Sequence, residues 1–196
     1  MSLKEENFEN KVDSDTIERH KHLQDIRTFN DYMNNVVKYG LKEKEYFDLF
    51  IELLKKLEFK ISNIKDIGCD KDKEFGVCLD SKQVNDTPDF GFSINDRDIS
   101  LEVKNSKYNL EEFHLKKFQV DNYTKIPSSF ILWIMDCNEN PHFTLLDPKE
   151  VSNLRVWKNP KYGDKEVYCL EKKNYKWFKF NISEELKEYI KEAILK

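Results

Sequence analysis

The chain has 196 residues with a formal net charge of −4, and 36% of its residues are charged, which suits one domain with a strongly solvated exterior. This net negative charge weighs against a protein that coats nucleic acid without specificity, because such binding depends on lysine and arginine. No apolar run reaches the length of a membrane span and the N-terminus lacks the apolar stretch of a signal peptide, so we expect a cytoplasmic protein with no membrane partner.

Two helices are predicted in the first third of the sequence. The first runs from about Asp15 to Gly40, with apolar residues at helical spacing, and forms an N-terminal helical extension over residues 1–40. It packs either on the main domain or on a second copy of the chain. The main domain is expected over residues 41–196, as an α/β fold with a central mixed β-sheet flanked by helices.

The second helix is predicted over residues 42–57 and has a broad apolar face. Glu45, Asp48 and Glu52 lie three or four residues apart, so they share one stripe of this helix. Two interpretations are open: a solvated acidic face, or a helix from which one acid reaches a functional site. In the second case Asp48, near the apolar border, is the best candidate.

A β-hairpin carrying functional side chains is predicted between residues 85 and 104, after a first strand that begins near residue 59. Residues 99–104 alternate between apolar and polar, so Glu102 and Lys104 lie on one face of a strand. A turn centred on residues 96–97 places Asp89 opposite Lys104, with Glu102 as its diagonal neighbour roughly 7 Å away. Two carboxylates at that separation can hold one divalent cation, with the lysine beside it.

The same residues also suit a solvent-facing hairpin with a cross-strand ion pair. Glu-x-Lys occurs four more times in this charged sequence, starting at residues 9, 58, 171 and 185. Only Glu102-Val103-Lys104 has a Pro-Asp pair, Pro88-Asp89, on the predicted partner strand. That combination favours the functional interpretation.

The second half of the chain alternates between predicted helices and strands. An amphipathic helix over residues 110–125 carries His114, Lys116 and Lys117, and it places Gln119 and Tyr123 on one face. The apolar run at 129–135 predicts a central strand that is covered on both faces. Further elements are a strand at 143–146, a short helix after residue 147, a hairpin at 167–181 and a closing helix capped by Ser183.

Residues 153–180 form a basic stretch, with eight lysines and arginines against three acidic residues. Aromatic residues are interleaved with this charge, and such a mixture can follow a nucleic-acid backbone and stack on its bases. A twisted hairpin with lysines on its solvent face and aromatics in the core explains the pattern equally well.

Cysteine and histidine spacing gives no metal motif. The four cysteines include no Cys-x-x-Cys pair, His20 and His22 are too close together for helical ligand spacing, and His114 and His142 are isolated. We therefore predict free thiols, and neither a structural zinc site nor an iron–sulfur site.

At the predicted hairpin the chain resembles the PD-(D/E)XK nuclease superfamily, with Pro88-Asp89 and Glu102-Val103-Lys104 as its two motif elements. The resemblance covers approximately residues 43–146 and implies a restriction-endonuclease-like core, in the order helix, strand, motif hairpin, helix, strand, strand. The N-terminal helix and a C-terminal hairpin plus helix are additions to that core.

This resemblance implies a metal-dependent DNA endonuclease that hydrolyses phosphodiester bonds with Mg²⁺, for which Mn²⁺ can substitute. It implies that Asp89 and Glu102 hold the cation, with the Val103 carbonyl as a candidate further ligand. In this superfamily a helix ahead of the motif strands often adds another acid to the metal site, and Asp48 is our candidate for it. Lys104 would orient the attacking water and stabilise the charge of the transition state.

The pair Gln119 and Tyr123 resembles a motif of the recombination-exonuclease branch of the same superfamily, in which the glutamine borders the active site. Gln119 is therefore a candidate catalytic residue. The expected partner is DNA, and the residues expected to contact it are Lys107, Lys116, Lys117 and Tyr123.

Several alternatives remain open on the sequence. Restriction in host defence, DNA repair or junction processing, and end processing by an exonuclease all suit such an enzyme. Cutting two strands commonly takes two active sites, which makes a homodimer plausible. The main alternative is a noncatalytic DNA-binding or scaffold protein that retains the nuclease fold. A further alternative is an α/β interaction module in which the three hairpin side chains have no catalytic role.

Overall fold

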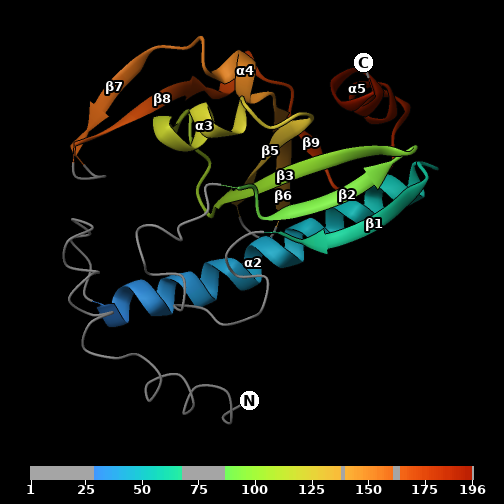
Figure 1. Cartoon of the computed structure of the whole chain (residues 1–196), viewed down its shortest axis with the longest axis horizontal. Coiled ribbons are helices and arrows are strands. Elements are labelled where there is room, and N and C mark those ends of the chain that lie inside the picture. The colour runs from blue at the N-terminus through green and yellow to red at the C-terminus, as the bar shows by residue number, and fades with distance from the viewer. Residues whose placement is uncertain (1–28, 68–86, 138–139, 161–163, 196) are drawn as a thin grey trace.

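A six-stranded mixed β-sheet forms the centre of the molecule (Figure 1). The computed structural model describes residues 29–67, 87–137, 140–160 and 164–195, and the side chains from residue 41 onward. The strand order is β1-β2-β3-β5-β6-β9, and β3 and β5 are parallel whereas the other neighbours are antiparallel. The strands are β1 Ile61–Asp66, β2 Phe90–Ile94, β3 Arg97–Ser106, β5 Ser129–Cys137, β6 Asn140–Leu146 and β9 Phe178–Lys179.

A smaller antiparallel sheet of three strands packs over the first, in the order β4-β8-β7. Its strands are β4 Glu112–Lys116, β7 Val156–Asn159 and β8 Lys165–Glu171. The helices are α2 Phe29–Lys56, α3 Lys117–Tyr123, α4 Pro148–Val151 and α5 Glu184–Ile194, with a 3-10 turn η2 at Lys172–Asn174. This arrangement is an α/β fold, as the sequence predicts. Among the described residues no helix is long and apolar enough to cross a lipid bilayer.

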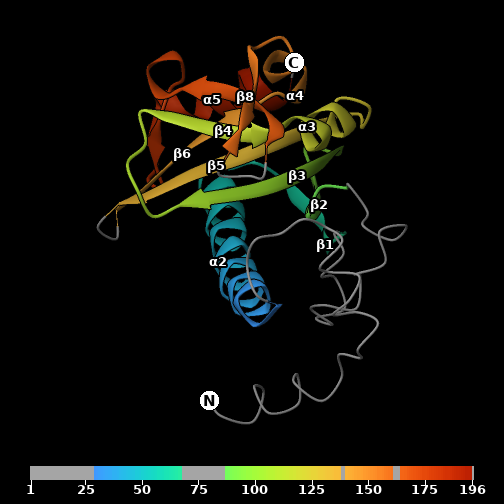
Figure 2. The same ribbon diagram turned by 90° about the vertical axis from the view of Figure 1, so that its left-hand side faces the viewer.

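Two hydrophobic clusters cover the two faces of the central sheet. The first joins α2 and α5 to side chains of β2, β3, β5 and β6, and includes Phe47, Leu101 and Val103. The second joins α3, β4 and β8 to the opposite face of β5, and includes Ile131 and Trp133. Figure 2 shows α2 on one side of the sheet and α3 with β4 and β8 on the other. Because β5 is buried on both faces, it is apolar almost without interruption.

The predicted break between two N-terminal helices was wrong. Helix α2 runs through Gly40 without interruption, and so crosses the expected domain boundary at residue 40. A glycine inside a helix costs about 1 kcal/mol, which does not end a helix whose next turns are anchored by packing. Tyr46, Phe50 and Leu54 provide that packing, since each is at most 2% exposed. The predicted start of the first helix, near Asp15, lies outside the described residues.

Two other predicted elements were also wrong. Residues 112–116 belong to strand β4 rather than to a helix, because Phe113 and Leu115 alternate into the core and β4 pairs with β8. Residues 167–181 do not form a hairpin, since β8 pairs with β4 and β7 whereas β9 pairs with β6 of the central sheet. The helix capped by Ser183 is confirmed, with the Leu186 amide donating to the Ser183 hydroxyl at 3.1 Å.

Candidate functional site

The turn between β2 and β3 sets the register of the motif hairpin. Ile94 pairs with Arg97 and leaves Asn95 and Asp96 as a two-residue turn, with φ angles of 48° and 66°. Asparagine and aspartate tolerate positive φ, and two such residues match the twist of antiparallel strands. The predicted turn at residues 96–97 was therefore wrong.

The observed register changes the partner of Asp89. Phe90 pairs with Leu101, so Asp89, just ahead of β2, lies opposite Glu102 rather than opposite Lys104. The error amounts to two residues, and a two-residue shift leaves every side chain on its predicted face. The Asp89 carbonyl accepts a hydrogen bond from the Ile67 amide at 2.8 Å, which fixes this part of the chain beside the end of β1.

Side chains from three elements meet at Glu102, which is 2% exposed. Lys104, two residues further along β3, forms an ion pair with Glu102 and has a side chain that is 29% exposed. Asp89 is hydrogen-bonded to the Glu102 carboxylate, and the Tyr123 hydroxyl of α3 donates to the same carboxylate. The sequence prediction that Asp89, Glu102 and Lys104 converge therefore agrees with the geometry.

Electrostatics show how tightly these groups are coupled. Burial and the nearby Glu102 charge raise the pKa of Asp89 well above its usual range, although Lys104 opposes the shift. A protonated Asp89 can then donate to Glu102. Burial alone lowers the pKa of Lys104, but the charges of Glu102, Glu43 and Asp89 outweigh burial and raise it, so Lys104 stays an ammonium. Burial and Glu102 also raise the pKa of Tyr123, which stays a neutral donor.

Two carboxylate oxygens at this site have no hydrogen-bond partner among the described residues. They are Asp89 Oδ2 and Glu102 Oε2, and both are buried, as is the unpartnered Thr87 Oγ1 nearby in sequence. Leaving a carboxyl oxygen buried and unpaired is costly, so such atoms call for a partner such as a water molecule, an ion or a ligand. Hard oxygen donors of this kind fit a divalent cation such as Mg²⁺.

The α2 acid beside the site is Glu43, not Asp48. Asp48 pairs with Lys44 at 2.6 Å and has a side chain that is 59% exposed. Glu43 instead acts on the pKa values of both Asp89 and Lys104. The prediction of Asp48 was wrong because it used only the position of this residue at the apolar border of the helix. In the structure Phe47 stacks on Phe90 of the hairpin. Glu43 lies one turn before Phe47, so this stacking brings Glu43 close to the hairpin.

The other predicted site residues lie at different distances from this cluster. Gln119 is half-buried on α3, one turn before Tyr123, and its role stays a prediction. The Val103 side chain is buried on the opposite face of the sheet, against α2, and the role of its carbonyl likewise stays a prediction. Tyr123 is only 3% exposed and contacts Glu102, which favours a role inside the site, and its contact with DNA stays a prediction.

The three lysines expected to contact DNA are spread over the segment after β3. Lys107 is exposed in the loop and lies 5.3 Å above the Tyr108 ring. Lys116 ends β4, and Lys117 begins α3 and pairs with Asp121. Their contact with nucleic acid stays a prediction.

The aromatic residues of the basic stretch mostly serve the core rather than the surface. Tyr168 is 3% exposed, and Trp177 packs on the second hydrophobic cluster. Trp157 is more open, at 37% exposure. For these side chains the core interpretation of the stretch holds better than the base-stacking one.

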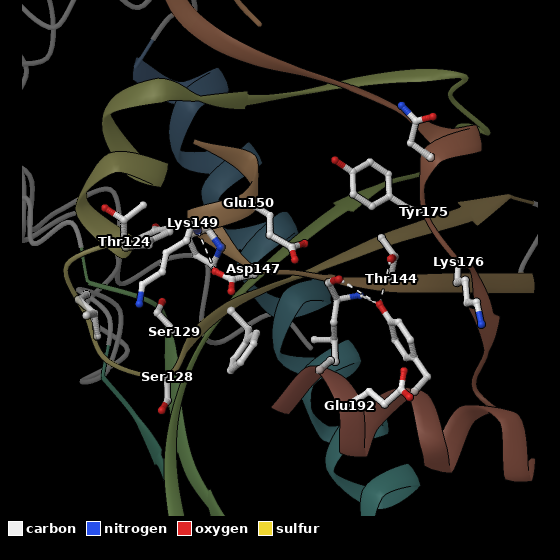
Figure 3. Close-up of a pocket in the computed structure, with 18 of the residues that line it drawn as sticks. Thr124, Ser128, Ser129, Thr144, Asp147, Lys149, Glu150, Tyr175, Lys176 and Glu192 are labelled. Atoms are coloured by element: carbon white, nitrogen blue, oxygen red, sulfur yellow. Dashed lines mark hydrogen bonds between the residues drawn. The ribbon is translucent and has the colours of Figure 1, made fainter. Parts of the chain in front are cut away.

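A pocket of about 530 Å³ opens beside α3 and shares Tyr123 with the acidic cluster. Figure 3 shows Lys149 and Ser129 on one side of this pocket and Lys176 on the other. Asp89, Glu102 and Lys104 do not line it. The charged side chains that line the pocket are balanced between cations and acids, so the lining does not indicate which class of ligand would bind.

No protein-family model matches this sequence, and no curated protein matches it either. The chemistry of the site is therefore inferred from the geometry of its own residues.

Proposed function

We propose that the protein is a Mg²⁺-dependent deoxyribonuclease, an endonuclease that hydrolyses phosphodiester bonds in DNA. The observation that carries this proposal is the contact between Asp89 and Glu102, two acids that each keep one buried oxygen without a partner among the described residues, next to the ammonium of Lys104. Two carboxylates and one ammonium are the groups needed to bind a hard cation and a phosphate side by side.

The order of elements supports the same proposal. Apart from the added strand β4 between β3 and α3, the elements α2, β1, the β2–β3 hairpin, α3 and the parallel strand β5 come in the order of a restriction-endonuclease-like core. In this order the two motif elements, Pro88-Asp89 and Glu102-Val103-Lys104, come together at one end of the hairpin.

Asp89 and Glu102 would hold the cation, with Glu43 of α2 close enough to act on the same charges. When bound, Mg²⁺ would neutralise phosphate charge and lower the pKa of a coordinated water. Side chains of the protein position the groups around the cation. Tyr123 fixes one side of the Glu102 carboxylate by a hydrogen bond, which leaves the other oxygen for the ligand.

Lys104 supplies the positive charge on the solvent side of the site. Its ammonium pairs with Glu102 and its side chain is 29% exposed, which would let it also meet an incoming phosphate. The ammonium donates hydrogen bonds to the attacking water and to a non-bridging oxygen, and its raised pKa keeps all three protons in place at neutral pH.

The test is cleavage of supercoiled plasmid with Mg²⁺ or Mn²⁺, comparing the wild type with Asp89→Ala and Lys104→Ala. We expect cleavage to fall by about 100-fold or more in both, because each removes a group of the reacting site. Glu52→Ala and Lys55→Ala are matched controls, since both members of this ion pair are exposed on α2, and we expect both to retain activity.

Other outcomes separate the alternatives. Gel-shift binding of DNA without cleavage supports a noncatalytic DNA-binding or scaffold protein with this fold. Absence of both activities supports an α/β interaction module. Cleavage that survives both Asp89→Ala and Lys104→Ala contradicts the proposed site.

A further inference from the structure

A second cluster of metal-ligating side chains lies on the small sheet, away from the acidic site. Glu112 and His114 are on β4, and Cys169 is on β8. Their ligand atoms all lie within 4.8 Å of one another. The arrangement follows from pairing, because His114 faces Cys169 directly across the β4–β8 ladder and Glu112 is two residues away on the same face.

The histidine of this cluster is held on both ring nitrogens. Its Nε2 is 2.9 Å from the Glu112 carboxylate, and the Asn159 amide donates to its Nδ1 at 3.3 Å. Asn159 is 4% exposed at the end of β7, so it is a buried partner of the imidazole rather than a surface side chain. The imidazole also packs against the Trp157 ring, with 5.4 Å between ring centroids.

We propose that Glu112, His114 and Cys169 bind a Zn²⁺ ion through the carboxylate, Nε2 and Sγ. One thiolate, one imidazole and one carboxylate are ligand types that zinc takes together, and three protein ligands leave a fourth position open. The metal joins β4 to β8 and so ties the small sheet together. No motif in the sequence indicated this site, because Cys169 is 55 residues beyond His114 and only strand pairing brings them together.

Zinc binding requires one proton to leave Cys169 and one proton to move on His114, and the site and the solvent account for both. Cys169 is a free thiol, and binding as thiolate releases its proton to solvent. The Nε2 proton of His114 moves to Nδ1 through solvent exchange. A half-turn of the Asn159 amide then lets its oxygen accept from Nδ1, the usual support for a histidine that binds metal.

The donor atoms distinguish this site from the proposed nuclease site. Asp89 and Glu102 offer oxygen only, which favours Mg²⁺, whereas sulfur and nitrogen at the small sheet favour zinc. Failure of one proposal therefore leaves the other intact.

The experiment is a titration of the full chain, first stripped with a chelator, with Co²⁺ as a spectroscopic substitute for zinc. We expect one equivalent of Co²⁺ to produce a sulfur-to-cobalt charge-transfer band, and Zn²⁺ to abolish that band by displacement. Cobalt bound at the oxygen-only nuclease site gives no such band. Addition of Zn²⁺ should also raise the Tm of the metal-free protein.

Matched variants assign the band to these residues. Cys169→Ser should lose it, and His114→Gln should weaken cobalt binding by about 10-fold or more, whereas Cys137→Ser should retain it. Asn159→Ala should weaken binding by about 10-fold, because it removes the group that supports the ligand imidazole. Far-UV circular dichroism of each variant checks that the fold is kept.

Cys69 and Cys78 lie outside the described residues, so their double replacement by serine is an essential control. We expect that variant to keep the band. A band absent from the wild type, retained in Cys169→Ser, or lost on replacing Cys69 and Cys78 overturns the proposal.

Discussion

The carboxyl groups of Asp89 and Glu102 are hydrogen-bonded to each other at the start of the β2–β3 hairpin, where Glu102 is buried and each carboxyl group has one oxygen screened from water. A contact between two acids opposes stability, because one of them must hold a proton or two like charges must share a buried site. Such an arrangement is retained where function needs it, and it makes the stability of the protein without metal a direct test of the site.

Replacing Asp89 by asparagine should stabilise the protein in the presence of a chelator. The amide can donate to Glu102 without carrying a charge, so we expect the free energy of unfolding to rise by about 1 kcal/mol. The measurement is denaturant unfolding of wild type and Asp89→Asn in chelator. A variant less stable than the wild type would contradict the repulsion between the two acids. Plasmid cleavage should be lost in the same variant.

Stability without metal should fall as pH rises above the ordinary aspartate range. The pKa of Asp89 is raised in the folded state above its ordinary value of 3.8, so between the two values the folded state binds more protons than the unfolded state. The stabilisation is complete below the unfolded pKa and is lost as pH rises through the folded one. Asp89→Asn should flatten this part of the pH profile, and an unchanged slope would rule out Asp89 as its source.

Glu43→Gln should reduce plasmid cleavage by about 10-fold while leaving the fold intact. Glu43 acts electrostatically on Asp89 and Lys104, so removing its charge weakens the field that holds a cation and an ammonium at the site. The matched control is Asp48→Asn on the exposed side of the same helix, which should cleave at the wild-type rate. Equal effects of the two substitutions would show that α2 contributes only its overall negative charge and that the position of Glu43 has no special role.

Tyr123→Phe separates a positioning role from a contact with DNA. The hydroxyl of Tyr123 donates to Glu102, so its removal should lower the cleavage rate by about 10-fold and leave DNA affinity unchanged. Single-turnover cleavage and gel-shift affinity measure the two effects. Loss of affinity at an unchanged cleavage rate would instead support the contact with DNA that the sequence suggested.

Phe47→Ala should be among the most destabilising substitutions in α2. The ring is fully buried and stacks on Phe90, with 4.1 Å between centroids and planes 8° apart. Truncation of a buried phenylalanine costs about 3–5 kcal/mol, and thermal unfolding measures the loss. Leu49→Ala provides the comparison, since Leu49 is 47% exposed and its truncation should change stability little.

The sequence predicts the site only where a local alternation of apolar and polar residues shows which face of a strand each side chain occupies. Alternation along residues 99–104 placed Glu102 and Lys104 on one face, and the Pro-Asp pair located the partner strand. The turn was misplaced by one residue, yet the resulting two-residue shift kept Asp89 on the correct face. Glu43 was missed because nothing local indicates which end of a helix lies beside a hairpin.

The amino-acid order by itself determined the elements whose pattern is strong: the buried strand β5, the Ser183-capped helix α5 and the alternating strand β3. In each, the pattern of apolar side chains or a cap is set by neighbours in the chain. Tertiary structure alone decided that residues 112–116 are a strand, that Glu43 reaches Asp89, and that Cys169 faces His114. Those outcomes depend on packing and pairing between segments far apart in sequence, and local propensity is too weak to fix them.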